Sequence, residues 1–292
     1  MKTIWFALTL LFISSVCYGQ NDRSIALNSM IATEYQFAKK ALQVGSRDAF
    51  LEFISDDGIL FRPTPVNGKE FLQKQNSRPG FLIWFPSYAF ISKSGDLGCT
   101  TGPAEFKRNM DSASIWYGNF CTVWQLQKDG KWKFLIDGGI SNKKPVNKIK
   151  GLEFDDKKIE LLDYKNISTS IADKQLIFDV DKKFNSLLEN GNILEAYSDV
   201  INDETRLLRE GEYPIIGTTE IMKYIIGYDG KFEFEFEIID GKISGAGDFG
   251  YVYGSLVVTG SKQPAKFNYI RIWRNDYGKW KIVIELFSPF SE

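Results

Sequence analysis

Two acidic residues occupy the same place in two similar stretches of this sequence. Asp137 lies five residues after Trp132, Glu285 lies five residues after Trp280, and both tryptophans belong to a Gly-Lys-Trp-Lys run. A carboxylate on a strand that faces a pocket can hold a polar group of a ligand, or take a proton from a carbon beside a carbonyl if burial raises its pKa. The alternative is that each acid pairs with a lysine or arginine on a neighbouring strand and serves the fold.

Asp57 is a weaker candidate for such a base. It follows Asp56, and the second half of the chain has Asn202 and Asp203 at the matching place. Adjacent acids after a helix commonly form a solvated turn, which is the competing interpretation. Proton abstraction also needs an oxyanion partner, such as a tyrosine. Several aromatic residues are candidates for that partner or for the lining of a ligand cavity, and each can equally be core: Tyr35, Trp84, Tyr88, Tyr117, Trp124, Tyr251, Tyr253 and Tyr269.

The composition excludes several kinds of chemistry. The chain has no histidine, which removes histidine nucleophile pairs, histidine acid–base catalysis and the commonest zinc ligand. The sequence contains no glycine-rich phosphate loop and no nucleophile elbow. We therefore expect no metal and no cofactor. With 36 basic against 37 acidic residues the chain is nearly neutral, and we expect no nucleic-acid partner. Arg62 and Arg271 remain as single candidates for holding an anionic ligand, or as edge charges.

Four glycine landmarks recur in the same order along the two halves of the chain. Their two copies are 146 (Gly45 and Gly191), 149 (Gly68 and Gly217), 152 (Gly95 and Gly247) and 148 residues apart (Gly130 and Gly278). A register kept over four landmarks indicates a tandem duplication. We therefore expect a first copy over residues 22–146, a linker over 147–175 and a second copy over 176–292.

Each copy starts with helical periodicity and ends with strands. Apolar residues recur every three or four positions from Leu27 to Leu42, and again from Ile177 to Leu188. Later segments alternate with period two, as where the phenylalanines of KFEFEFEIID alternate with glutamates. Helices followed by a meandering antiparallel sheet are the order of an α+β domain, so we predict two α+β domains in tandem.

Three segments of the first copy resemble a known family. They are DAFLEFISDDGILFRPTPVNGKEFL, WFPSYAFISKSGDLGCTTGP and FCTVWQLQKDGKWKFLIDGGIS, and they are similar to the SnoaL-like branch of the nuclear-transport-factor-2-like superfamily. The second copy is more weakly similar. The resemblance implies cone-shaped domains, in which a few N-terminal helices pack on a strongly curved antiparallel sheet with a pocket at the wide end. It implies little about activity, because this fold hosts isomerases, dehydratases, cyclases and non-catalytic domains.

Cys99 and Cys121 fall on two strands that we expect to be neighbours. If the turn between them is centred near Met110, positions whose numbers sum to 220 face each other, and these two cysteines do. A cross-strand disulfide and two buried thiols are both compatible with the sequence.

The N-terminal run MKTIWFALTLLFISSVCYGQ is typical of a signal peptide. Lys2 precedes an apolar stretch that is too short to span a bilayer, and Cys17-Tyr18-Gly19 fits a cleavage site. We predict that residues 1–19 are removed and that the protein is periplasmic or secreted, with no stable membrane insertion. The rival interpretation, a lipoprotein anchored through Cys17, fits the three preceding residues poorly.

These observations favour an exported protein that binds a small, partly apolar ligand in a cone pocket, without established catalysis. One alternative is a metal-independent isomerase, dehydratase or cyclase-like enzyme that uses a carboxylate and a tyrosine. Another is a structural module, in which the two copies form an internal pseudo-dimer through their sheets or a homo-oligomer forms. A deep cavity with Asp137 or Glu285 near a tyrosine would favour the enzyme, and filled cones would favour the structural module.

Overall fold

The computed structural model describes residues 4–152, 173–260 and 263–290, and for residues 4–22 it gives the course of a helix without side chains. The predicted signal peptide therefore lies outside the described side chains, and most of the predicted linker lies outside the described residues. Among the described residues, no helix combines the length and the apolar character needed to cross a bilayer.

Within residues 4–152 the chain forms three helices and one seven-stranded sheet. The helices are α1 (Ile4–Val44), α2 (Ser46–Phe53) and α3 (Gly68–Gln73). The strands are β1 (Ile54–Phe61), β2 (Pro65–Asn67), β3 (Phe81–Trp84), β4 (Tyr88–Ile91), β5 (Leu97–Lys107), β6 (Trp116–Leu126) and β7 (Trp132–Ser141).

Within residues 173–260 and 263–290 the plan repeats, with three helices and one six-stranded sheet. The helices are α4 (Gln175–Glu189), α5 (Ile193–Val200) and α6 (Thr218–Ile226). The strands are β8 (Arg206–Arg209), β9 (Ile215–Ile216), β10 (Glu233–Ile243), β11 (Phe249–Thr259), β12 (Ala265–Asp276) and β13 (Lys279–Pro289). The expected α+β class, with two separate sheets, is confirmed.

Both sheets are meanders with one departure from the expected antiparallel order. The strand that follows the second helix inserts beside the last strand of its own half, so β1 pairs with β7 and β8 with β13, and both pairs are parallel. The long strands β5, β6 and β7, like β10 to β13, are antiparallel as expected. The parallel pair brings the end of β1 next to the middle of β7, where Asp137 lies.

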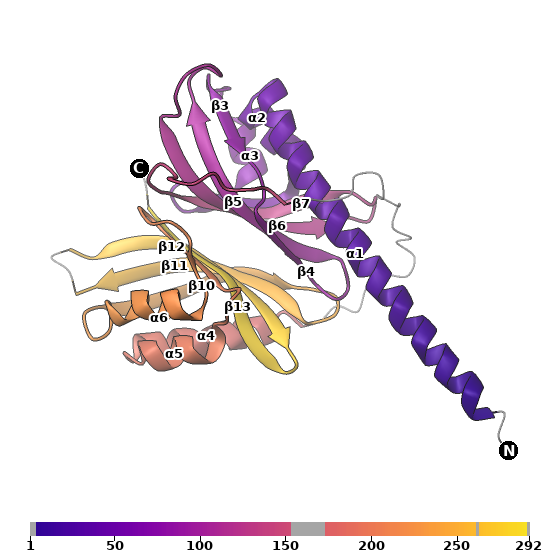
Figure 1. The fold of residues 1–292 in the computed structure, drawn as a ribbon. Coiled ribbons are helices and arrows are strands. Elements are labelled where there is room, and N and C mark those ends of the chain that lie inside the picture. Colours follow the sequence, from indigo (N-terminus) through magenta and orange to yellow (C-terminus); the bar gives the residue numbers. More distant parts are fainter. Residues whose placement is uncertain (1–3, 153–172, 261–262, 291–292) are drawn as a thin grey trace.

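The two sheets pack against each other, with helices on their outer sides (Figure 1). Between them lies an inter-sheet core to which both halves contribute buried side chains, among them Val123 and Ile136 of the first sheet and Ile270 and Ile284 of the second. A separate core lies under the helices of each half. Burial of apolar side chains between the sheets holds the halves together.

The turns that lead into β5 and β11 have the same geometry. Gly95 and Gly247 have φ angles of 68° and 67°, a left-handed conformation that favours glycine. Ser92 and Ser244 each accept a hydrogen bond at Oγ from the backbone amide five residues later, at 3.3 Å in both turns.

These two turns bind each other reciprocally. Asp96 of the first turn accepts a hydrogen bond at Oδ2 from the amide of Gly245, at 2.9 Å. Asp248 of the second turn accepts from the amide of Lys93 at both carboxylate oxygens, at 3.1 and 3.2 Å. Each of the two matching turns thus accepts a hydrogen bond from the backbone of the other.

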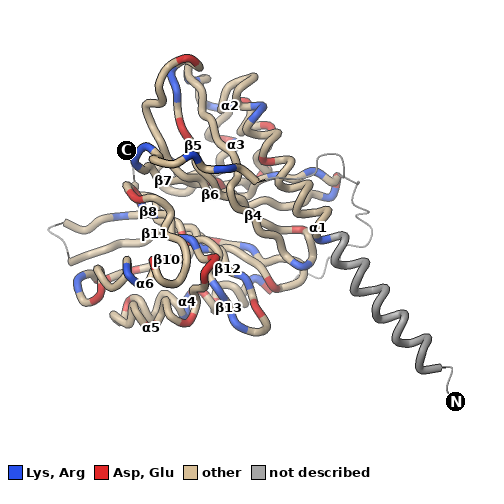
Figure 2. The backbone as a smooth tube through the Cα atoms, in the orientation of Figure 1, with Lys and Arg blue, Asp and Glu red and all other residues tan. Residues whose placement is uncertain are grey.

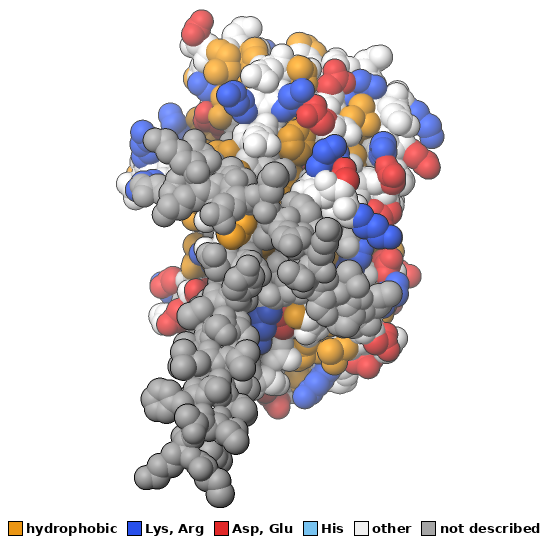
Figure 3. Space-filling model, turned by 90° about the vertical axis from the view of Figure 1, so that its right-hand side faces the viewer, with side chains coloured by type: hydrophobic (Ala, Val, Ile, Leu, Met, Phe, Trp, Pro, Cys, Tyr) orange, Lys and Arg blue, Asp and Glu red, His pale blue; other side chains and the backbone are white. Residues whose placement is uncertain are grey.

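Charged residues of both signs are mixed along the chain rather than segregated. Figure 2 shows lysine, arginine and acidic residues alternating over both halves, and the face in Figure 3 shows the same mixture around small hydrophobic groups. The described surface therefore carries no extended basic stripe in these views.

Candidate functional site

A cavity of about 350 Å³ lies between the helices and the sheet of the first half. We call it the first cavity. Its aromatic lining is formed by Phe37, Phe50, Phe61, Trp84, Trp116 and Phe120. Its polar lining includes Arg62, Asn119, Asp137, Ser141, Glu210 and Ser288. A cavity of this size, lined by aromatic side chains together with convergent polar groups, is compatible with a small-molecule site.

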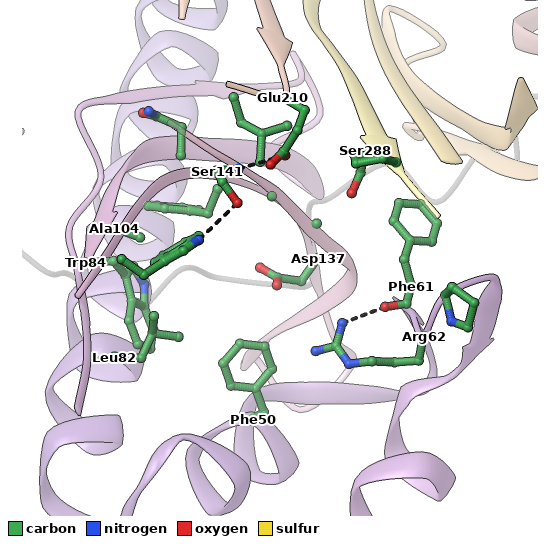
Figure 4. A pocket seen from close by; sticks show the side chains of 18 of the residues that line it. Phe50, Phe61, Arg62, Leu82, Trp84, Ala104, Asp137, Ser141, Glu210 and Ser288 are labelled. Atoms are coloured by element: carbon green, nitrogen blue, oxygen red, sulfur yellow. Dashed lines mark hydrogen bonds between the residues drawn. The ribbon is translucent and has the colours of Figure 1, made fainter. Parts of the chain in front are cut away.

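Asp137 points into the first cavity from β7 (Figure 4). Its Oδ2 accepts a hydrogen bond from Thr122 Oγ1 at 2.6 Å, across the β6–β7 ladder. Among the described residues this is its one hydrogen bond, so Oδ1 is left for a ligand. Burial raises the pKa of Asp137 to about 7, and the hydrogen bond from Thr122 only partly opposes this effect. The carboxyl group can therefore both donate and accept protons near neutral pH.

Arg62 lies across the first cavity from Asp137. It directly follows β1, and Figure 4 shows its guanidinium directed into the space beside Phe50. Nη1 donates to the carbonyl oxygen of Phe61 at 2.6 Å, which fixes one end of the group. The positive charge of Arg62 lowers the pKa of Asp137, although less than burial raises it. The carboxyl group of Asp137 and the guanidinium group of Arg62 thus share the cavity without a direct hydrogen bond between them.

Glu34 binds the indole nitrogens of two tryptophans next to the first cavity. This fully buried glutamate of α1 accepts hydrogen bonds from Trp84 Nε1 at 2.6 Å and Trp124 Nε1 at 3.0 Å, and from Thr100 Oγ1 at 2.5 Å. Burial raises the pKa of Glu34 against these three hydrogen bonds. With its indole nitrogen bound to Glu34, Trp84 is held in one orientation against the cavity.

The second half of the chain closes one side of the first cavity. Glu210, Ser288 and Pro289 contribute to its lining. Glu210 Oε2 accepts a hydrogen bond from the amide of Ser141 at 2.9 Å, and Figure 4 shows this contact at the rim. The site is therefore built from both halves.

Glu285 occupies the same strand position as Asp137 but has a different environment. Its Oε2 accepts from Arg271 Nε at 2.7 Å, and its Oε1 accepts from Tyr197 at 2.6 Å and from Arg209. Burial alone would raise the pKa of Glu285, but the two arginines outweigh it and hold the pKa below its ordinary value. Glu285 is thus a fully buried, ionised member of an ion-pair network.

The residue opposite each acid explains this difference. Thr122 is the cross-strand partner of Asp137, and Arg271 is the cross-strand partner of Glu285. Arg271 also donates to Asp181 Oδ1 of α4 at 2.7 Å, so it bridges two buried carboxylates. Threonine offers one hydrogen bond and no charge, and Asp137 is left available for chemistry.

Other expected candidates lie outside the first cavity. Asp57 is an exposed residue of β1 that accepts a hydrogen bond from Ser55 at 2.7 Å. Tyr35 donates to the carbonyl oxygen of Leu152 at 2.9 Å. Tyr88 lies under Arg206 of the second half, whose guanidinium carbon is 3.5 Å from the ring centre. Asp57 thus lies on the surface, Tyr35 contacts the segment after β7, and Tyr88 contacts the second half.

The remaining aromatic candidates are dispersed as well. Tyr117 lines a separate hollow beside residues 144–149. Trp124 is fully buried in the helix-side core, Tyr251 and Tyr253 belong to the inter-sheet core, and Tyr269 donates to Asp181 in the core of the second half. No tyrosine is among the residues that line the first cavity in the described chain. The expected carboxylate–tyrosine pair is therefore replaced at Asp137 by a carboxylate–arginine pair.

The expected register of the two cysteines is wrong by two residues. Cys99 pairs with Val123 and Cys121 pairs with Thr101, so facing positions sum to 222 and the two cysteines are diagonal neighbours. The turn is centred one residue later than assumed. Both thiols are free and fully buried, and burial raises the pKa of Cys99 to about 12.

Two acidic residues near the first cavity, Glu34 and Glu210, were not predicted from the sequence. Glu34 interrupts the apolar stripe of α1 between Ile31 and Phe37, and an acid on the apolar face of a helix is a signal for a buried polar contact. Glu210 carries no comparable local signal, because it reaches the first cavity only through the packing of the two halves.

No protein-family model matches this sequence, and no curated protein matches it. Solved structures with a similar fold are found. A ketosteroid isomerase-like protein from Erwinia carotovora atroseptica has 16% identity and a TM-score of 0.36, over 41% of this chain and 97% of that one. An NTF2-like protein from Cytophaga hutchinsonii has 19% identity and a TM-score of 0.33, over 41% and 99%. An LEH-like epoxide hydrolase from M. tuberculosis has 14% and 0.33, over 40% and 79%.

Each match covers about two fifths of the chain. At these identities and TM-scores, nothing about the chemistry of this chain follows from the neighbours' names. In each half of the chain, helices pack on one sheet, as the expected α+β class requires.

Proposed function

We propose that the protein binds a small, partly apolar molecule in the first cavity, with a polar group of the ligand at Asp137. The observation that carries this proposal is the carboxylate oxygen Oδ1 of Asp137, which faces a cavity of about 350 Å³ without a hydrogen-bond partner among the described residues. A ligand that supplies a hydrogen bond to this oxygen gains free energy from the contact.

The chemistry of the lining indicates a ligand with a carbonyl or hydroxyl group on a ring-shaped apolar body. Asp137 can donate or accept a hydrogen bond near neutral pH, because its pKa is about 7. Arg62 can donate to an oxygen of the same ligand. The aromatic wall, with Trp84 held by Glu34, offers flat surfaces for the body.

Filling the cavity tests this proposal. Ala104 lines the first cavity, and Ala104→Trp would occupy its space. A thermal-shift screen with neutral one- and two-ring ketones and alcohols should give compounds that stabilise the wild type but not Ala104→Trp, and Asp137→Asn should weaken their effect. The matched control is Ala265→Trp in the second half, which should leave these shifts intact. Equal shifts in the wild type and Ala104→Trp would contradict the proposal.

A second candidate function is proton transfer beside a carbonyl. The pKa of about 7 favours it, because a base is most effective when its pKa is near the working pH. Asp137 would take a proton from the carbon, and Arg62 would stabilise the negative charge that develops on the carbonyl oxygen.

Deuterium exchange measures this activity directly. Incorporation of deuterium from heavy water into cyclohexanone, followed by NMR, should rise with pH and reach half its maximum near pH 7. Asp137→Asn should lower the enzyme-dependent rate by roughly 100-fold or more. Exchange that is unchanged in the variant would exclude this role of Asp137 and leave the binding proposal intact.

We further propose that the protein is exported with cleavage after Gly19, and that its copies, over residues 22–146 and 176–292, act as an internal pseudo-dimer. The reciprocal contacts of Asp96 and Asp248 and the inter-sheet core support the second part. N-terminal sequencing and intact mass of protein from the cell envelope and the medium test the first part. A mature chain that begins at Gln20 is expected, and an acyl group on Cys17 would establish the lipoprotein instead.

A further inference from the structure

The second half contains a cavity of its own, which we call the second cavity. It has a volume of about 340 Å³ and lies between α5, α6 and the sheet. Its wall is mostly aromatic, with Tyr224, Tyr228, Phe232, Phe234, Phe267 and Phe287 among its residues. It differs from the first cavity because its charged side chains already have hydrogen-bond partners within the protein.

Arg209, the cation of the second cavity, is engaged through both terminal nitrogens of its guanidinium group. Its Nη2 donates to the Glu285 carboxylate and to Tyr197, and its Nη1 donates to the carbonyl oxygens of Leu208 at 3.2 Å and Glu285 at 3.1 Å. Its guanidinium carbon lies 3.7 Å from the centre of the Phe287 ring. With its charge compensated by Glu285, Arg209 has little left to offer an anion.

Glu210, the acidic residue at the second cavity, already accepts a hydrogen bond from the first half. Glu210 lines both cavities, and its Oε2 accepts from the amide of Ser141 in the first half. Its negative charge at the rim further disfavours an anionic ligand. A ligand that carries no charge avoids both the repulsion and the cost of losing its hydration.

A pair of tyrosines supplies a neutral polar contact. The hydroxyl groups of Tyr224 and Tyr228 are 2.8 Å apart, and their ring centres are 4.9 Å apart. One hydroxyl donates to the other, and the second hydroxyl has no acceptor for its hydrogen among the described residues. Burial raises the pKa of Tyr224, so the group stays protonated and can donate at neutral pH. The Tyr228 ring is also 5.4 Å from that of Phe232, which extends the aromatic surface.

We propose that the second cavity is a separate binding site for a neutral one- or two-ring aromatic compound that carries a single oxygen acceptor. The rings lie against the aromatic wall, and the oxygen accepts a hydrogen bond from the Tyr224–Tyr228 pair. The volume lies near the lower limit for small-molecule sites, which restricts the ligand to this size. The two cavities thus differ in their polar contact, which is the carboxyl group of Asp137 in the first cavity and the tyrosine pair in the second.

Titration calorimetry of the full chain with 2-naphthol at pH 7 tests this inference. The first cavity is filled by Ala104→Trp in one variant, and the second cavity is filled by Ala265→Trp, whose alanine lines it at the start of β12. 2-Naphthol should bind Ala104→Trp with one site, and the double variant should lose at least roughly 10-fold in affinity. Tyr224→Phe in the Ala104→Trp background removes one oxygen atom and should weaken binding roughly 2- to 10-fold, and it replaces Ala265→Trp if that variant does not fold.

The charged analogue 2-naphthoate is the control for ligand class. It should bind Ala104→Trp at least roughly 10-fold more weakly than 2-naphthol. The inference is overturned if 2-naphthol does not bind Ala104→Trp, if neither Ala265→Trp nor Tyr224→Phe weakens its binding, or if 2-naphthoate binds as tightly. The proposal for the first cavity is tested separately. It depends on compounds whose thermal shift is lost in Ala104→Trp but kept in Ala265→Trp.

Discussion

Replacing Asp137 by asparagine should change how the stability of the protein depends on pH. The pKa of Asp137 is raised from its ordinary value near 4 to about 7 in the folded protein, a difference of roughly three units. At about 1.4 kcal/mol per unit, this corresponds to about 4 kcal/mol at most, and water in the first cavity reduces it to about 2–4 kcal/mol.

The direction follows from the raised pKa. The unfolded chain releases this proton near pH 4, whereas the folded chain keeps it until about pH 7. The contribution of Asp137 to stability is therefore fully present below about pH 4 and is lost as the pH rises through about 7. Asparagine cannot ionise, so the stability of Asp137→Asn relative to the wild type should increase by about 2–4 kcal/mol between about pH 4 and pH 8.

Urea unfolding followed by tryptophan fluorescence measures this difference. Glu34, whose pKa is also raised by burial, is present in both proteins, so that only its Coulombic coupling to Asp137 enters the comparison. A difference in unfolding free energy that stays constant over this pH range would refute the assignment of a raised pKa to Asp137.

Three further predictions concern the rest of the fold. Glu285→Gln leaves Arg209 without its Glu285 counter-charge and leaves Arg271 paired with Asp181, and it should cost about 3–5 kcal/mol in urea unfolding; a loss below about 1 kcal/mol would show that the network is not needed. Asp96→Ala removes the acceptor for a backbone amide of the other half and should cost about 1.5–3 kcal/mol, and an unchanged unfolding midpoint would dismiss the reciprocal turn contact. Without reducing agent, Cys99 and Cys121 should be alkylated only after denaturation, when mass spectrometry should find two modified thiols; an intramolecular disulfide would give none.

The helices and strands could be predicted from the sequence because local patterns of apolar residues determine them. The apolar stripe that starts at Leu27 predicted the described part of α1, and the alternating phenylalanines of the KFEFEFEIID run predicted β10. The parallel placement of β1 beside β7 was not accessible, since no local pattern records which strand a segment joins.

The candidate site was accessible only in part. The position of Asp137 on its strand is a matter of spacing, but its availability depends on which residue lies opposite. That residue is Thr122, where the second half has Arg271, and knowing this requires a register accurate to one residue. The error of two residues at Cys99 shows that the sequence alone did not supply such accuracy.

The central claim is that the two halves place an acid at the same strand position and that only the acid of the first half is available for chemistry. Carbon-13 NMR titration of the side-chain carboxyl groups tests it in one measurement, with aspartate and glutamate labelled separately and Asp137→Asn used for assignment. We predict that Asp137 titrates near pH 7 and that Glu285 titrates below the ordinary glutamate value. An Asp137 whose pKa is near 4 would contradict this prediction. A Glu285 whose pKa lies above the ordinary glutamate value would contradict it as well.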